Sequence, residues 1–104
     1  MNRLAALQQF LAQDPNDSFT RYAIGLEHAK ALNYAEAIQT LEELRSRDPN
    51  YIPTYYMLAS YYREIADTAK ARATYREGIA KARAARDLHA ASELDAALDE
   101  LESE

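Results

Sequence analysis

The sequence repeats itself at a fixed period, and this period constrains the fold more than any other feature. Asp14-Pro15 recurs as Asp48-Pro49, and the step from one pair to the other defines the period. Three apolar positions recur at the same offset: Ile24 corresponds to Leu58, Ala37 to Ala71 and Leu41 to Tyr75. Similarity at one fixed period is typical of supersecondary units stacked in series rather than of a single interwoven core. We therefore expect like-shaped units that pack on their neighbours along the chain.

The composition makes each unit helical. Alanine is abundant, valine is absent and only 2 of the 104 residues are glycine, so good helix formers outnumber strand formers. No stretch of four or more residues alternates apolar and polar side chains in the manner of a strand. We expect an all-α fold of about six helices. Because cysteine is absent, disulfides and thiol chemistry are excluded.

Stop and start signals divide the chain into these helices. Both Asp-Pro pairs end a helix, because the residue before proline is pushed out of helical geometry. Asp17 or Ser18 caps the second helix, and Asp67 caps the fifth. Pro53 is tolerated at the start of a helix. The connections are short, so consecutive helices are expected to be antiparallel. The predicted helices cover residues 2–13, 18–32, 34–47, 53–66, 68–85 and 88–102.

The second unit carries a recognisable motif. Tyr55-x₂-Leu58-Ala59-x₂-Tyr62 is followed by Ala71-x₃-Tyr75, and the first unit matches in part, with Ile24-Gly25-x₂-His28, Ala37-x₃-Leu41 and Pro49. This pattern resembles the tetratricopeptide repeat family. Two departures stand out. Arg21 occupies the place of a large aromatic residue, and Arg83 stands where a closing proline is expected, so the fifth helix should continue past that point.

The resemblance implies a right-handed α-α superhelix of antiparallel helices in a single domain over residues 1–104. Its parts would be an N-terminal half-repeat helix (1–14), repeat one (17–49), repeat two (52–85) and a C-terminal capping helix (87–102). Gly25 and Ala59 are small where paired helices cross. The capping helix would bury one apolar face, made of Ala91, Leu94, Leu98 and Leu101, and expose carboxylates on its other faces.

Charge and hydropathy limit the partners and the compartment. The net charge of −5 argues against nucleic acid, which needs a concentrated basic face. Arg72, Arg76 and Arg83 do share a helical face, but we expect the acidic residues 87–104 to dock there and neutralise it. The segment from Met1 to Phe10 does not read as a signal peptide, and no run is apolar enough to cross a membrane. A cytoplasmic protein without membrane contact is expected.

The residues that could act in catalysis or bind a metal do not form a recognisable site in the sequence. His28 falls on a core position and is interpreted as structural. His89 and Glu93 share a helical face, but no third ligand accompanies them, so a surface pair is expected rather than a metal site. The paired carboxylates Glu42-Glu43 are interpreted as a solvated face. We therefore predict no catalytic activity, no cofactor and no metal.

The remaining function is binding. In the family that this chain resembles, the first helix of each unit lines a concave groove that takes peptides. The resemblance implies a protein or peptide partner, inserted between Tyr22 and Tyr56 and steered by Lys30 and Arg63. Tyr22, Leu26 and Met57 replace the lysine and asparagines with which chaperone-binding members clamp a terminal carboxylate, so no such clamp is expected. The implied groove residues are Phe19, Tyr22, Leu26, Lys30, Tyr56, Ser60, Arg63 and Glu64.

Two alternatives remain open at this point. Phe19 and Tyr22 could simply cover the opening helix and leave no groove there. Alternatively, the protein could be a self-associating structural protein, a homo-oligomer in which the apolar face of Leu4–Leu11 meets that of Leu94–Leu101.

Overall fold

Six helices and short connections account for the structure, a computed structural model that describes residues 2–104. Met1, with which the expected first segment begins, lies outside the described residues. None of the helices combines the length and the apolar character that a membrane crossing requires, within this described range. The helices are α1 (Arg3–Gln13), α2 (Ser18–Lys30), α3 (Tyr34–Arg47), α4 (Pro53–Glu64), α5 (Thr68–Ala84) and α6 (Leu88–Glu102).

The helix starts follow the predicted caps. The side chain of Asp17 accepts a hydrogen bond from the Thr20 N–H, and Asp67 accepts one from the Lys70 N–H in the same way. Asp87 repeats this arrangement at the start of α6. Each cap satisfies one of the backbone N–H groups that a first turn leaves without an intrahelical partner.

Two helices end slightly earlier than predicted, and the backbone shows why. α2 stops at Lys30 and α4 at Glu64, short of the expected ends. Leu32 and Ala66, which lie one period apart, have positive φ angles of 65° and 63°. A residue in this left-handed conformation cannot continue a right-handed helix. Because Arg83 replaces the closing proline, α5 is predicted to continue past that position. It does so, and it has 17 residues, whereas α3 has 14.

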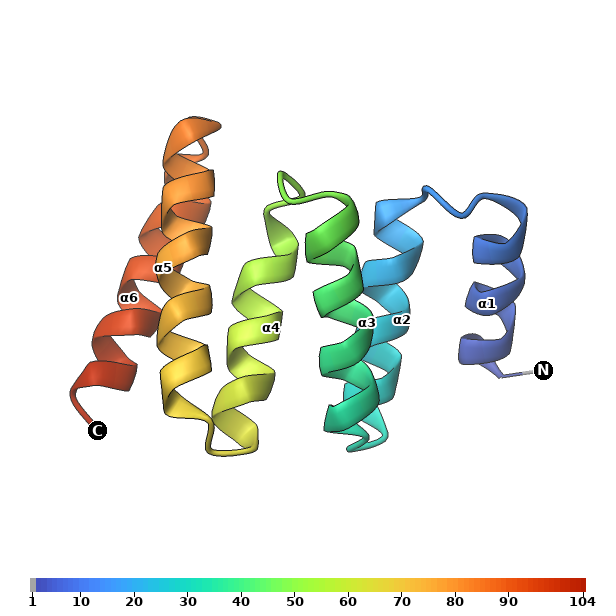
Figure 1. Cartoon of the computed structure of the whole chain (residues 1–104), viewed down its shortest axis with the longest axis horizontal. Coiled ribbons are helices and arrows are strands. Elements are labelled where there is room, and N and C mark those ends of the chain that lie inside the picture. The colour runs from blue at the N-terminus through green and yellow to red at the C-terminus, as the bar shows by residue number, and fades with distance from the viewer. Residues whose placement is uncertain (1) are drawn as a thin grey trace.

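Consecutive helices are antiparallel neighbours along the long axis of the molecule (Figure 1). Because α2 also contacts α4, the helices do not form one simple row. α2 packs on α3 and α4 packs on α5, which gives two helical hairpins, with α1 on the outer side of α2 and α6 against α5. The molecule extends over 42 × 29 × 19 Å, as expected of units stacked along one direction. The predicted all-α, right-handed helical-repeat fold of six antiparallel helices is confirmed.

The core lies between the helices and is largest under the second hairpin. The motif residues Tyr55, Leu58, Tyr62 and Tyr75 are all buried, in one cluster that reaches from α3 to α6. His28, expected in the core, is only half-buried. A small second cluster, which contains Leu7, Ala23 and Ile24, joins α1 to α2.

Phe10 lies one period before Leu44, but its burial differs from that of Leu44. Leu44 is fully buried between α3 and its neighbours, whereas Phe10 is 57% exposed. The equivalence fails because the described chain has no helix on the outer side of α1 to cover that ring. Among the described residues, α1 is therefore packed on one side alone.

The last helix packs as its sequence predicts. Ala91, Leu94, Leu98 and Leu101 are buried, and the acidic residues around them pair with the basic face of α5. Glu102 lies 3.3 Å from Arg76 and 3.7 Å from Arg72, and Asp95 lies 3.1 Å from Arg83. The expected neutralisation of this basic face is confirmed. Because the Leu94–Leu101 face is used inside the molecule, it is not available to meet a second copy.

Candidate functional site

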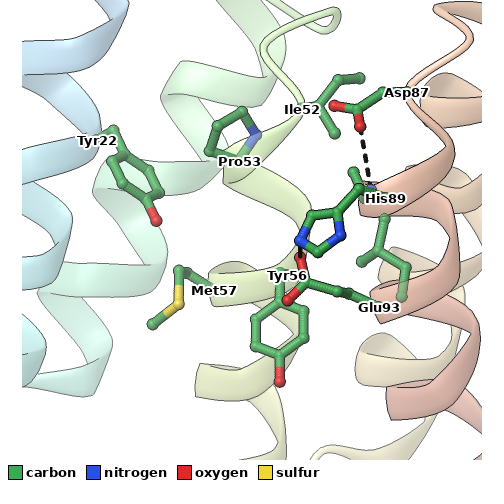
Figure 2. Close-up of a pocket in the computed structure, with 10 residues that line it drawn as sticks. Tyr22, Ile52, Pro53, Tyr56, Met57, Asp87, His89 and Glu93 are labelled. Carbon is green, nitrogen blue, oxygen red and sulfur yellow. Dashed lines mark hydrogen bonds and ion pairs between the residues drawn. The ribbon is translucent and has the colours of Figure 1, made fainter.

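A hollow of about 330 Å³ lies where α2, α4 and α6 come together. Its walls are mainly apolar and aromatic, and a few polar side chains stand at its edge (Figure 2). Pockets of this size and character are typical binding sites. The lining residues are Tyr22 from α2, Ile52, Pro53, Tyr56 and Met57 from the start of α4, and Asp87, His89, Ala90, Glu93 and Leu94 from the start of α6.

Two tyrosines supply most of the aromatic surface. The ring of Tyr22 meets that of Tyr51 edge to face, with ring centroids 5.9 Å apart. Burial raises the pKa of Tyr22 above its ordinary value. The rings of Tyr56 and Tyr75 also meet edge to face, and Tyr56 is still 43% exposed. Both rings are held in place by neighbours and present apolar surface to the hollow, so Tyr22 does not merely cover α1.

The edge of the hollow on the α6 side is polar and acidic. His89 Nε2 lies 3.3 Å from Glu93 Oε1, and both side chains are largely exposed, at 87% and 57%. The predicted surface pair is therefore present. Asp87 lies at the N-cap of α6, with one carboxylate oxygen engaged in capping that helix. Among residues 2–104, no group of three His, Cys, Asp or Glu side chains is placed to hold a metal ion.

A second hollow, of about 420 Å³, lies at the other ends of α4 and α6 and holds three more of the predicted groove residues, Ser60, Arg63 and Glu64. Arg63 is already engaged there, with its guanidinium 2.8 Å from Glu104 and 3.4 Å from Glu100. A guanidinium bound by two carboxylates of its own chain is poorly suited to steer a partner. The expectation that Arg63 steers the partner is therefore not supported by its surroundings.

The other three predicted residues line neither hollow. Phe19 is 63% exposed, Lys30 is exposed and Leu26 is half-buried. Of the eight predicted residues, the structure thus brings Tyr22 and Tyr56 to the first hollow and three to the second.

The residues of α6 are the part of the site that the sequence prediction missed. It treated this helix as a cap and assigned the groove to the first helices of two units. The period of the repeat, applied once more along the chain, would have identified them. Tyr22 and Tyr56 are one period apart, and one further period reaches Ala90, while the same step from Ser60 reaches Leu94. Both residues line the first hollow, so the start of α6 extends the surface begun by α2 and α4.

A polar cluster occupies the space between α3, α4 and α5. The Tyr62 hydroxyl donates a hydrogen bond to Glu42, and Arg45 pairs with Glu42 at 2.9 Å and with Glu77 at 2.8 Å. Glu42 is therefore half-buried and bonded, contrary to the solvated face predicted for it. Its neighbour Glu43 points elsewhere and pairs with Arg47 and Arg21. Every charged group in the cluster has a partner, which is typical of a structural network.

Comparison with known proteins agrees with this architecture. A family model described as tetratricopeptide repeat matches residues 21–51 and 54–82. The chain is 41% identical to a tetratricopeptide repeat domain protein from Salinibacter ruber, with a TM-score of 0.83 over 86% of this chain and 91% of that one. No curated protein matches the sequence.

Two more distant structures share the fold. The TPR2B domain of yeast Sti1, solved as a complex with pHsp70, has a TM-score of 0.89 at 20% identity and covers 96% of this chain and 80% of that one. PcrH, solved with the chaperone binding region of PopD, has a TM-score of 0.87 at 18% identity and covers 96% of this chain and 76% of that one. At these identities the likeness concerns the fold.

Proposed function

The chain belongs to the tetratricopeptide repeat family, and we propose that it is a protein-interaction module that takes a segment of a partner protein into the hollow between α2, α4 and α6. The observation that carries this proposal is the hollow itself, with Tyr22, Met57 and the exposed ring of Tyr56 on its walls. The two distant structures of the same fold were both solved with protein partners.

The physical basis of the proposal is the kind of surface that the hollow offers. Tyrosine supplies a large, rigid contact area and is enriched among the residues that dominate binding energy at interfaces. Met57 adds a flexible apolar side chain that adapts to different shapes. A partner side chain that enters the hollow would replace water against these groups, which is favourable because apolar surface leaves water.

Affinity capture with matched variants tests the proposal. The intact chain is immobilised beside a Tyr22→Ala, Tyr56→Ala double variant and a Phe10→Ala control, which removes an exposed aromatic ring outside the hollow. We expect the intact chain and the control to retain the same partner, and the double variant to bind it at least about 10-fold more weakly. Circular dichroism and thermal melting establish that each variant is folded.

A partner retained equally by all three proteins would place the interaction elsewhere and overturn the proposal. Loss from Phe10→Ala together with retention by the double variant would do the same, and would move the site to the outer face of α1.

A further inference from the structure

We propose that the partner segment carries a lysine or arginine within about one helical turn of the apolar side chain that enters the hollow. This inference rests on the proposed function and specifies the chemistry of its partner. It follows from the charges around the hollow, where carboxylates stand beside the apolar walls and where the lining residues of the described chain include neither lysine nor arginine.

Glu93 is the main anchor for that cation. Its side chain is 57% exposed, and within residues 2–104 its one ion pair is with His89, which carries charge only when protonated. Asp87 has one oxygen bonded to the Ala90 N–H and is exposed at the same edge. Figure 2 shows both side chains on the α6 side of the hollow, across from Tyr22 and Met57.

Three other carboxylates on α6 provide the contrast. Asp95, Glu100 and Glu102 each lie within 3.4 Å of an arginine side chain of the same molecule. These groups are already neutralised and help to hold α6 in place. Glu93 and Asp87 lie beside the hollow without an arginine or lysine of the chain bound to them in the described structure, so their charge is available to a partner.

A long basic side chain fits this arrangement for two reasons. Its methylene stem can lie along the ring of Tyr56, which is 43% exposed, while its charged end reaches the carboxylates, as lysine and arginine do at the edges of apolar surfaces. The net charge of −5 also attracts a basic segment over longer distances and speeds its association at low salt. An acidic segment would instead meet like charge at the edge of the hollow.

A random dodecapeptide library, displayed on phage and selected on the immobilised full chain, is the probe for this inference. Enriched peptides are synthesised, and their affinities are measured by fluorescence anisotropy at low and high salt. We expect a basic residue within four positions of a large apolar residue, and binding that weakens as salt rises. Glu93→Gln should weaken binding about 2- to 5-fold, and Asp87→Asn, which keeps a capping side chain, should add a further loss.

Asp99→Asn is the matched control, since it removes one negative charge from an exposed position on the same helix away from the hollow. It should leave the affinity within about 1.5-fold of the intact chain, because a distant exposed charge is screened by salt.

The outcomes separate this inference from the function on which it rests. Acidic or uncharged peptides that depend on Tyr22 and Tyr56 would overturn the cation preference and leave the interaction site intact. Basic peptides that respond equally to Glu93→Gln and Asp99→Asn would also overturn it. Peptides insensitive to the tyrosine double variant, or a library without any enriched sequence, would contradict both proposals.

Discussion

In the hairpin α2–α3, the two helices pack closely at Gly25, where the side chain of Leu41 fills the space. In the hairpin α4–α5, they pack closely at Gly78, against the side chain of Tyr55. The two glycines are on opposite helices of their hairpins. The residue one period after Gly25 is Ala59, and the residue one period before Gly78 is Leu44. Each hairpin therefore pairs a small residue with a large one, and the pair differs between the two. What recurs is the match of small against large, rather than the identity of any one side chain.

The same contrast holds for Arg21 and Tyr55, which are also one period apart. The Arg21 guanidinium donates two hydrogen bonds to the carbonyl oxygen of Pro15, and the Tyr55 hydroxyl donates one to the carbonyl oxygen of Pro49. Arginine thus takes over the contact of the expected aromatic residue. It binds the equivalent carbonyl, and although its side chain is only 9% exposed, it also pairs with the exposed carboxylate of Glu43 at 3.3 Å. Both side chains are buried, so the comparison indicates that this position is held mainly by hydrogen bonds and an ion pair in the first hairpin and mainly by a packed aromatic ring in the second.

The largest expected effect comes from truncating these two residues. Tyr55→Ala removes a fully buried ring and should reduce the free energy of unfolding by about 3–5 kcal/mol. Arg21→Ala removes mainly hydrogen bonds to a carbonyl and should cost about 1.5–3 kcal/mol. Urea denaturation of both variants in one buffer measures the difference. Equal losses would break the contrast between the hairpins.

Because Tyr55→Ala removes a large part of the usual total stability, Tyr55→Phe serves as its companion. This variant keeps the ring and loses the hydrogen bond to Pro49, so a loss of about 0.5–1.5 kcal/mol is expected. A loss as large as that of Tyr55→Ala would mean that the hydroxyl, and not burial of the ring, holds the second hairpin.

A smaller effect distinguishes the two glycines. A methyl group at Gly78 would lie 2.5 Å from Cβ of Tyr55, an atom fixed by the backbone, so Gly78→Ala should cost about 1–3 kcal/mol. At Gly25 it would meet Cδ2 and Cγ of Leu41 at 2.6 and 2.9 Å, atoms further from the backbone than Cβ, so the buried Leu41 side chain must shift but the backbone need not. Alanine favours a helix over glycine by about 1 kcal/mol at both positions, so Gly25→Ala should cost less than Gly78→Ala because only a side chain has to move. Thermal melting of both variants checks the order, and a reversed order would refute this explanation.

The smallest effect concerns the charge contact between the hairpins. Arg45 on α3 pairs with Glu77 on α5 at 2.8 Å, and both side chains are more than a third exposed. A double-mutant cycle with Arg45→Ala and Glu77→Ala should give a coupling of about 0.2–1 kcal/mol that falls with added salt. A coupling well above this range, unaffected by salt, would show that charge rather than packing joins the two hairpins.

The fold was predictable because its signals are local and repeated. The Asp-Pro stops, the aspartate caps and the fixed period together define all six helices, and they agree with one another. What the sequence did not show was the behaviour of single residues at the end of the stacked helices. Phe10 follows the period but is exposed, because burial depends on a neighbouring helix that the described chain does not supply on that side.

The site was predictable only where it follows the period. Tyr22 and Tyr56 were found because equivalent positions of stacked units share one surface. The contribution of Asp87, His89 and Glu93 was missed because the apolar pattern of α6 identifies a packed face and does not show which surface its other face joins. The engagement of Arg63 by Glu100 and Glu104 was missed for another reason, since it joins residues that are far apart in the sequence and share no local pattern.

The most direct test of the central claim is a set of intermolecular nuclear Overhauser effects between the labelled chain and a peptide selected on it. We predict contacts from the peptide to the side chains of Tyr22, Tyr56 and Met57, on the walls of the first hollow. Contacts confined to the opposite surface of α3 and α5, around Arg45 and Lys70, would contradict the claim that the partner is taken between α2, α4 and α6.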